Sequence, residues 1–254
     1  MHRKELAMKI SGWRVTKMYL ADLVRWPILA LFGSATFVIF FIFNRTRVIG
    51  RHHVPHGRNV IYACRHLTLV DSFPVTLAAM RLRDFFCPWL LPWHTADKAN
   101  YMKTRLMAIW GWCMKIQPIA HSRIDPGALR AMSRLARYGR LFVFPGGTRE
   151  RPNKPITPRI GIGHVAYETG ATIVPVWIDG MEKVFPLGEE RFHNGKDILI
   201  AFGQPVDYSD LIANADQTDP RTVKRAIADR ATRAIYSLGA GLGGNPPIEA
   251  FQRS

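Results

Sequence analysis

Cysteine is scarce in this sequence, and its spacing argues against two common uses of the residue. The chain has three cysteines among 254 residues, and no two of them form a CxxC motif. A small, odd number of cysteines without that spacing fits neither a disulfide framework nor a structural zinc site. We interpret Cys64, Cys87 and Cys113 as reduced, buried thiols.

Acidic residues are also few, and the imbalance predicts an anionic partner. There are 19 Asp and Glu against 35 Lys and Arg, which gives a formal net charge of +16. Nucleic acid, anionic lipid headgroups and phosphorylated substrates all fit such a charge, and the charge alone does not choose among them. The hydrophobic content of 48% supports one sizeable α/β domain with a packed core.

The N-terminal region lacks a signal-peptide cleavage site, but it contains a long apolar segment. Trp26–Asn44 has no charged residue over 19 positions, which at about 1.5 Å per residue approaches the roughly 30 Å hydrocarbon thickness of a bilayer. Ser11–Arg25 before it has the pattern of an amphipathic interfacial helix. We therefore predict a two-helix, membrane-embedded segment over residues 1–47. Basic residues at both ends suit a helix pair in one leaflet and leave its orientation open.

The rest of the chain has the pattern of an α/β domain, which we expect over residues 48–238, followed by a flexible Gly/Pro-rich tail at 239–254. Apolar runs alternate with helical stretches, which predicts a mostly parallel central sheet flanked by helices. The predicted strands are 47–50, 59–63, 141–144, 172–178 and 198–202. The predicted helices are 71–80, 103–114, 126–138, 161–169 and 220–237.

Two segments that follow predicted strands carry candidate catalytic chemistry. In RHLTLVD, a turn between His66 and Asp71 can bring the carboxylate to one imidazole nitrogen, which leaves the other free to take a proton from an alcohol. A helix-capping Asp and a structural His would fit the same spacing. In FPGGTRE, the paired glycines allow backbone N–H groups to approach an anion, and Arg149 can grip a phosphate. A plain Gly-rich turn with a surface Arg is the alternative there.

Together, these segments resemble the glycerophosphate and lysophospholipid acyltransferase family over most of Val48–Val206. The family's first motif, NHxSxxD, is similar to RHLTLVD, in which Arg65 replaces Asn and Thr68 replaces Ser. The resemblance implies that His66 is the general base and that Asp71 orients it.

The family's other motifs are found further along the chain. Its third motif, FPEGTRS, is similar to FPGGTRE, with Gly146 in place of the acidic residue and Glu150 in place of the last Ser. Its second and fourth motifs resemble Gly111–Arg123 and the strand around Pro175, and Lys98 resembles a family Lys. The resemblance implies these substrate-binding residues: Lys98, Arg123, Gly146, Gly147, Thr148, Arg149, Glu150 and Pro175.

The implied reaction is direct transfer of a fatty acyl group from acyl-CoA or acyl-carrier protein to the hydroxyl of a lysophospholipid, with 1-acylglycerol-3-phosphate as the first choice. It needs no cofactor, metal or covalent enzyme intermediate, and nearby donors would stabilise the oxyanion. Basic residues near the motifs would hold substrate phosphates, although part of them would form an ordinary solvated surface. These residues are Lys98, Lys103, Arg105, Arg123, Arg149, Arg151, Lys154 and Arg159.

The departures from the family motifs leave alternatives open. The missing acidic residue at Gly146, with Glu150 shortly after, also resembles diacylglycerol acyltransferases, so a neutral glyceride or unusual lipid is an alternative acceptor. A nonenzymatic, membrane-tethered lipid-binding protein is another. A nucleic-acid partner is disfavoured because it needs no apolar anchor. We expect the chain in the inner, cytoplasmic membrane, in contact with membrane lipids and with its catalytic domain on the cytoplasmic side.

Histidines cluster in RHHVPH, but no carboxylate or Cys follows at an interval that suits a metal site. We interpret His52, His53 and His56 as loop residues and expect no metal.

Overall fold

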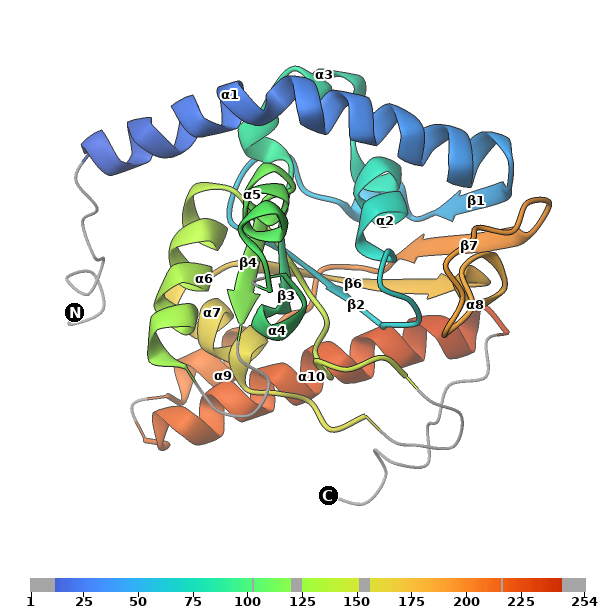
Figure 1. Ribbon diagram of the computed structural model, residues 1–254. Helices are drawn as coiled ribbons and strands as arrows, with labels where there is room; N and C mark the ends of the chain where they lie inside the picture. The colour runs from blue at the N-terminus through green and yellow to red at the C-terminus, as the bar shows by residue number, and fades with distance from the viewer. Residues whose placement is uncertain (1–11, 102, 120–124, 151–155, 216, 244–254) are drawn as a thin grey trace.

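A seven-stranded sheet forms the centre of the protein. The computed structural model describes residues 12–101, 103–119, 125–150, 156–215 and 217–243. The strand order is β1-β7-β6-β2-β5-β3-β4. Figure 1 shows β1 and β7 toward one side of the sheet and β3 and β4 toward the other. The strands are β1 Arg45–Ile49, β2 Val60–Cys64, β3 Trp93–Asp97, β4 Ile116–Ile119, β5 Arg140–Val143, β6 Thr172–Asp179 and β7 Asp197–Phe202.

The sheet is mostly parallel, as the sequence predicts, with one reversal. β6, β2, β5, β3 and β4 run in the same direction, whereas β7 pairs antiparallel with β6 and parallel with β1. The carboxyl ends of β2 and β5, which pair with each other, therefore lie at the same edge of the sheet. Substrate sites in open α/β sheets form at that edge.

Helices cover both faces of the sheet, because successive side chains of each strand point to opposite faces. On β2, Ile61 and Ala63 pack under α6, α7 and α10, whereas Val60, Tyr62 and Cys64 face α2 and the π-helical turn that follows α1. The bounds of the covering helices are α1 Gly12–Phe37, α2 Ser72–Ala79, α6 Pro126–Tyr138, α7 Gly161–Thr169 and α10 Pro220–Gly241. Shorter helices are α3 Leu82–Phe85, α4 Lys98–Tyr101, α5 Arg105–Cys113, α8 Met181–Val184 and α9 Ser209–Ala213, with short turns at Val38–Ile42, Arg51–His53 and Pro88–Leu90.

The strands β3 and β4 were not predicted from the sequence. β3 has the sequence WHTAD and β4 has IQPI, so neither shows a run of β-branched or alternating apolar residues. Both lie at one end of the sheet, where a proline and half-exposed polar side chains are tolerated.

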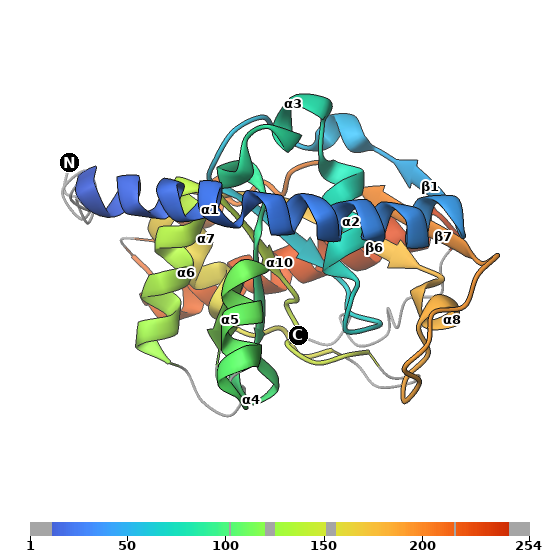
Figure 2. The same cartoon turned by 45° about the horizontal axis from the view of Figure 1, so that its top comes forward.

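The predicted pair of N-terminal helices is wrong: the structure has one continuous helix, α1, which ends in a single π-helical turn at Val38–Ile42. Pro27 lies inside α1 without ending it, although proline lacks the N–H that would bond to the carbonyl of Leu23 and its ring crowds that carbonyl. The helix lies across the top of the domain in Figure 1 and passes along its length in Figure 2. Val15–Ile42 is long and apolar enough to cross a membrane, and few of its residues are buried in the domain.

Buried charges attach α1 to the domain. Asp22 accepts hydrogen bonds from Arg25, 2.9 Å away, and from Lys115 of the segment between α5 and β4, 3.0 Å away. Lys115 also donates to the carbonyl oxygen of Pro88. Burial lowers the pKa of Lys115 to about 8, and the Asp22 carboxylate partly opposes this shift. The charges pair with each other because an unpaired buried charge is very costly.

The expected flexible tail begins inside a helix. α10 continues through Gly241, past both its predicted end at 237 and the predicted start of the tail at 239. The remainder of the tail, residues 244–254, lies outside the described residues, as do residues 1–11 of the N-terminal segment. The predicted bounds of α6 and α7 are confirmed.

Candidate functional site

The structure brings His66 and Asp71 together at the carboxyl end of β2. The two residues are separated by one turn, after which α2 begins, and Nδ1 of His66 lies 3.1 Å from Oδ2 of Asp71. Asp71 is fully buried, whereas the His66 side chain is 15% exposed. The pair therefore has an anchored carboxylate and an imidazole that solvent can reach.

Four hydrogen bonds fix the Asp71 carboxylate. Its Oδ2 accepts from the backbone N–H groups of Leu67 and Thr68, at 2.6 and 2.7 Å, as well as facing His66. Its Oδ1 accepts from the Thr68 hydroxyl at 2.6 Å. Because a carboxylate in this setting acts as the acceptor, Nδ1 of His66 carries the proton and Nε2 keeps its lone pair. In that tautomer, Nε2 is the imidazole nitrogen that is able to accept a hydrogen bond.

The loop after β5 packs directly on the imidazole. The Phe144 ring stacks on His66 with 3.8 Å between ring centroids and an interplanar angle of 15°. The chain then turns at Gly147, whose φ of +69° favours glycine and whose N–H donates to the carbonyl of Phe144. The N–H of Glu150 donates to the carbonyl of His66 at 2.7 Å. The two predicted motifs are thus in contact through the stacked rings of Phe144 and His66 and through a backbone hydrogen bond from Glu150 to His66.

Ile156 explains one of the two departures in FPGGTRE. A Cβ atom at Gly146 would lie 2.5 Å from Cγ2 of Ile156, closer than real Cβ contacts allow. The acidic residue of the family motif therefore does not fit at position 146 unless Ile156 moves. No pattern in the sequence predicts this contact, since Ile156 lies in a segment without regular structure.

Two of the residues that depart from the family motifs, Arg65 and Glu150, are charged, and they pair with each other. Nη2 of Arg65 lies 2.8 Å from Oε2 of Glu150, and Nε donates to the same oxygen at 3.0 Å. The second carboxylate oxygen of Glu150 accepts from the hydroxyl of Tyr236 on α10 at 2.8 Å. Arg65 also lies over the Trp177 ring, 3.9 Å from its centroid, and 3.5 Å from Asp179. Tyr236 and Trp177 were missed because they lie far from the motifs in the sequence.

The other predicted substrate-binding residues lie in different parts of the domain. Thr148 and Arg149 lie in the loop after β5, and Arg149 has no ion-pair partner among the described residues. Lys98 is exposed at the start of α4, after β3. Pro175 is buried within β6 and pairs with Ala63 rather than reaching the sheet edge.

The expected basic residues include three that lie outside the described residues: Arg123, Arg151 and Lys154. Arg159 is described, and its side chain donates to the carbonyl of Gly146. Within the described ranges, no group of three His, Cys, Asp or Glu side chains is arranged to hold a metal ion.

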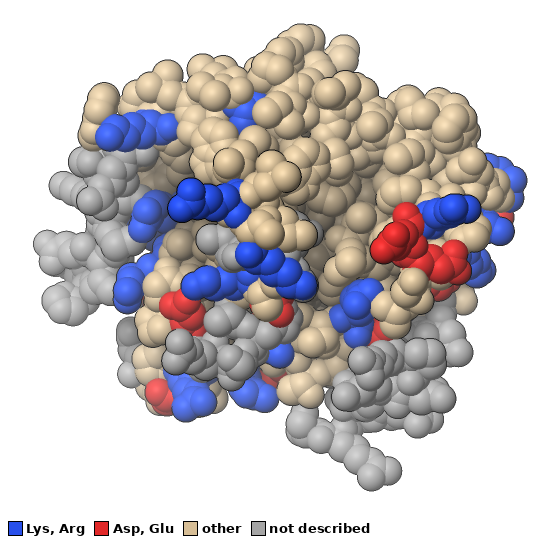
Figure 3. All heavy atoms as spheres, viewed as in Figure 1, with Lys and Arg blue, Asp and Glu red and all other residues tan. Residues whose placement is uncertain are grey.

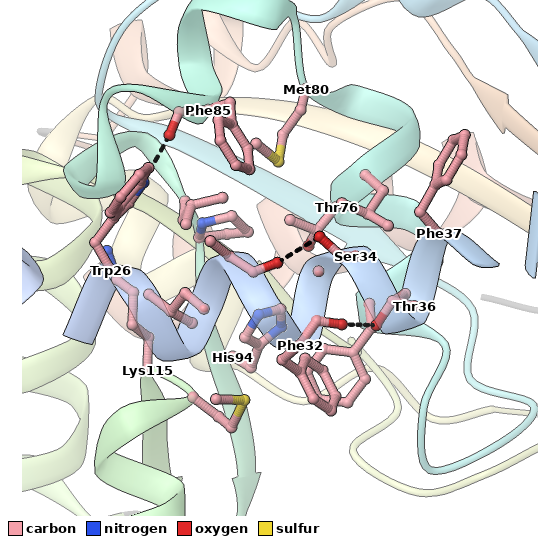
Figure 4. Close-up of a pocket in the computed structure, with 18 of the residues that line it drawn as sticks. Trp26, Phe32, Ser34, Thr36, Phe37, Thr76, Met80, Phe85, His94 and Lys115 are labelled. Atoms are coloured by element: carbon pink, nitrogen blue, oxygen red, sulfur yellow. Dashed lines mark hydrogen bonds between the residues drawn. The ribbon is translucent and has the colours of Figure 1, made fainter. Parts of the chain in front are cut away.

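An apolar cavity of about 370 Å³ lies between α1 and α2 (Figure 4). Its volume is in the range of about 300–1,000 Å³ that is common for small-molecule sites. Phe32 of α1 and Phe73 of α2 contact each other edge to face in its wall. His94 and Lys115 line the same cavity, and Nδ1 of His94 has no hydrogen-bond partner in the part of the chain that the structure describes. Burial, together with the nearby Lys115 charge, lowers the pKa of His94 to about 3.

Apolar and basic side chains separate on the face shown in Figure 3. Most of the part over α1 is tan, apart from basic side chains toward its left end, whereas more Lys and Arg side chains gather below it (Figure 3). Exposed large apolar side chains on α1 and the neighbouring α3 and α5 include Leu20, Leu23, Val24, Ile28, Leu31, Leu82, Leu106 and Ile109.

Comparisons with known proteins confirm the resemblance to an acyltransferase family. A family model described as Acyltransferase matches residues 45–179, from β1 through β6. The 1-acyl-sn-glycerol-3-phosphate acyltransferase LPAT1, chloroplastic, of Arabidopsis thaliana is 28% identical over 117 residues, which are 43% of this chain and 33% of that protein. The corresponding BAT2 protein of Brassica napus is 26% identical over 107 residues, 40% of this chain and 31% of its own length. The chain thus spans about a third of the length of these relatives.

A solved structure has the same fold. The 1-acyl-sn-glycerophosphate acyltransferase PlsC of Thermotoga maritima aligns with a TM-score of 0.56 and 20% identity, covering 91% of this chain and 85% of that one. At this identity, the likeness establishes the mixed α/β fold alone. With the family model covering more than half of the sequence, the chain belongs to the Acyltransferase family.

Proposed function

We propose that the protein is an enzyme that transfers a fatty acyl group from a thioester to the hydroxyl of a lysophospholipid, with 1-acylglycerol-3-phosphate as the favoured acceptor. The observation that carries the proposal is the hydrogen-bonded pair of His66 and Asp71, whose imidazole is accessible to solvent. The Acyltransferase family model spans both residues. The names of the two plant relatives, which refer to 1-acyl-sn-glycerol-3-phosphate, support the choice of acceptor.

The proposed reaction uses His66 first as a base and then as an acid. Nε2 removes the proton of the acceptor hydroxyl while the hydroxyl oxygen attacks the thioester carbonyl carbon. The C–S bond then breaks, the new ester C–O bond remains, and the imidazolium returns the proton to the leaving thiolate. Asp71 stabilises the imidazolium between these steps and keeps Nε2 directed outward. No covalent enzyme intermediate is required.

Cations near the site are proposed to bind the acceptor phosphate or the phosphates of the donor. Arg149 has no ion-pair partner among the described residues, and its fork of N–H groups suits a phosphate. Lys98, exposed after β3, is a second candidate, because β3 runs parallel to β5 and β5 to β2, so that the three strands end at the same edge of the sheet. We propose either acyl-CoA or acyl-carrier protein as the acyl donor, because both supply a suitable thioester.

The cavity between α1 and α2 is proposed to take an acyl chain. Its wall is formed mostly by apolar side chains, including Leu29, Leu77 and Met80. Removal of a fatty chain from water is favourable by about 0.8 kcal/mol per buried CH₂ group. α2 begins directly after Asp71, so the cavity and the catalytic pair share an element.

Membrane association is proposed to occur through α1. The helix presents exposed apolar side chains along its outer face while Asp22 and Arg25 are buried toward the domain. This arrangement suits a helix lying in one leaflet of the membrane. Because the donors named above are soluble, we propose that the catalytic domain lies on the cytoplasmic side of the cytoplasmic membrane.

A neutral glyceride is the alternative acceptor, and the absence of a carboxylate at Gly146 favours it. Both oxygens of Glu150, the nearest acidic side chain in that loop, are engaged by Arg65 and Tyr236. A site without a free carboxylate at this position has one polar group fewer to bind a polar acceptor headgroup, which favours an acceptor without one.

Purified protein should be assayed in mixed micelles with labelled acyl-CoA or acyl-carrier protein. The acceptors should be 1-acylglycerol-3-phosphate, lysophosphatidylcholine, monoacylglycerol and diacylglycerol. We expect the highest kcat/KM with 1-acylglycerol-3-phosphate. A higher kcat/KM with either glyceride would replace the favoured acceptor with the neutral one, and no transfer to any acceptor would support a nonenzymatic lipid-binding protein.

A further inference from the structure

We infer that Arg65 and Glu150 form a positioning pair that holds the His66 loop against the loop after β5. The inference rests on the proposed function, because it concerns the placement of the proposed base. It gives a role to two residues at which the sequence departs from the family motifs. It also implies that each of the two replacements is tolerated only when the other is present.

The side chains of the pair are joined directly and are largely shielded from water. Two nitrogens of Arg65 lie 2.8 and 3.0 Å from one oxygen of Glu150. The exposed fractions of the two side chains are 12% and 8%. Partly buried, doubly hydrogen-bonded ion pairs are stronger than exposed ones.

The backbone closes the pair into a ring that includes His66. Glu150 donates its N–H to the carbonyl of His66 at 2.7 Å, and His66 follows Arg65 directly in the chain. The closed circuit of contacts therefore runs from the Arg65 guanidinium to the Glu150 carboxylate, along Glu150 to its N–H, and back through the backbone of His66 to Arg65. Any shift of Glu150 moves the peptide that carries the imidazole. Stacking of Phe144, at the start of the same loop, adds a second contact.

The core holds both ends of the pair in place. Tyr236 on α10 donates to the second oxygen of Glu150, and the guanidinium of Arg65 lies over the Trp177 ring. Gly239 allows Trp177 to pack against α10, because a Cβ there would lie 2.4 Å from the ring. The pair thus ties the catalytic loops to β6 and α10.

The same contacts disfavour direct binding of substrate by these two residues. Arg65 is engaged by Glu150, Trp177 and Asp179, and a phosphate would have to displace at least one of them. Both carboxylate oxygens of Glu150 are occupied as well. Replacing either partner alone leaves a poorly solvated charge, whereas replacing both leaves none.

The test is a double-mutant cycle in the full chain with Arg65→Asn, Glu150→Ser and the double variant, which carries the family's residues at both positions. Small displacements of catalytic groups cost about 100-fold in rate, so we expect each single variant to lose about 10- to 100-fold in kcat with KM changed less than threefold. We expect the double variant to recover to within about tenfold of the parent. Arg65→Lys, which keeps the charge, should lose less than Arg65→Asn.

Hydrogen exchange of the segment Phe144–Glu150 provides a readout that does not depend on activity. Exchange should be at least tenfold faster in each single variant and close to that of the parent in the double variant. If the parent transfers no acyl group, the proposed function fails, and this exchange pattern alone decides on the pair. Circular dichroism identifies a variant that does not fold. If Arg65→Asn does not fold, Arg65→Lys takes its place in the cycle.

The exposed pair of Arg45 and Asp197 is a matched control. Its nitrogen and oxygen lie 2.6 Å apart, but the side chains are 67% and 78% exposed, and they join β1 to β7, which β6 separates from β2. Arg45→Asn and Asp197→Ser should change neither kcat nor exchange of Phe144–Glu150. Additive losses in the Arg65 and Glu150 double variant, or single variants with the kcat and exchange of the parent, would overturn the inference.

Discussion

Thr68 shows how a single side chain in the turn after β2 supports the proposed base. Its backbone N–H and its hydroxyl bond to different oxygens of Asp71, which in turn faces His66. The sequence predicted the pairing of His66 with Asp71, because turn, strand and helix signals all fall within a short segment. It did not predict Ile156 or Tyr236, since contacts over long sequence separations leave no local pattern.

Replacement of Thr68 tests this support. Thr68→Val removes the hydroxyl but keeps the volume, and loss of a hydrogen bond to a charged group costs about 1.5–3 kcal/mol. We expect the free energy of unfolding to fall by that amount and kcat to fall about tenfold. Thr68→Ser, which keeps the hydroxyl, is the control. Urea unfolding and a transfer assay on both variants provide the measurement, and equal behaviour of Val and Ser would argue against the role of this hydroxyl.

The contact between Gly146 and Ile156 predicts a second coupled pair. Gly146→Glu forces the Ile156 side chain to move, and overpacking of this kind costs about 1–3 kcal/mol. Ile156→Ala makes room, so the double variant should be less destabilised than the sum of the two single variants. Calorimetric unfolding of the four proteins measures the coupling. Additive destabilisation would mean that Ile156 does not restrict position 146.

At the scale of secondary structure, α1 is the element that differs most from expectation. Sequence periodicity predicted two helices, because an amphipathic stretch is followed by an uncharged one. The structure joins them into one helix, whose inner face carries the buried charges of Asp22 and Arg25. Helix attachment through Lys115 could not be predicted, since the partners are separated by 93 positions. The mostly parallel sheet was predicted from strand and helix alternation, but its polar strands β3 and β4 were not.

Charge pairing under α1 can be tested by removing one or both partners. Asp22→Asn leaves Lys115 without its carboxylate, and breaking a buried pair in this way costs about 3–5 kcal/mol. We expect the double variant with Lys115→Met to be more stable than Asp22→Asn alone. Chemical denaturation is the measurement. A fully additive loss would show that the two side chains are not coupled.

Membrane binding is best tested on the outer face of α1. Deleting the helix would expose the apolar cavity and leave Lys115 unpaired, so substitutions are cleaner than truncation. We expect Leu20→Ser, Val24→Ser and Leu31→Ser, combined in one protein, to abolish sedimentation with anionic phospholipid vesicles. The three side chains are exposed and apolar. Leu187→Ser, an exposed leucine after α8, should bind vesicles as the parent does. Undiminished binding of the triple variant would place the anchor elsewhere.

At the scale of the whole molecule, the cavity under α1 links stability to pH through His94. Its imidazole is buried beside Phe73 and Phe142, and this burial, together with the nearby Lys115 ammonium, disfavours the charged form. The folded pKa is about 3, against 6.5 for the free side chain. Between these values the unfolded chain binds the additional proton, so stability is full above about pH 6.5 and falls as the pH decreases toward 3.

We expect the free energy of unfolding to decrease by up to about 1.4 kcal/mol per pH unit below pH 6 because of this one group. His94→Phe, which suits the aromatic neighbours, should remove that part of the slope. Burial also lowers the pKa of His164, so the comparison is between the parent and the variant rather than with a flat line. Urea unfolding from pH 4 to 7 provides the data, and identical slopes would contradict the shift at His94.

The central claim is that the imidazole of His66 takes the proton of the acceptor hydroxyl. The most direct measurement is the initial rate of transfer from labelled acyl-CoA to 1-acylglycerol-3-phosphate by purified parent and His66→Ala proteins of equal thermal stability. Positioned general bases contribute about 100- to 10,000-fold, so we expect the variant to lose activity by that factor. A His66→Ala protein as active as the parent would contradict the account.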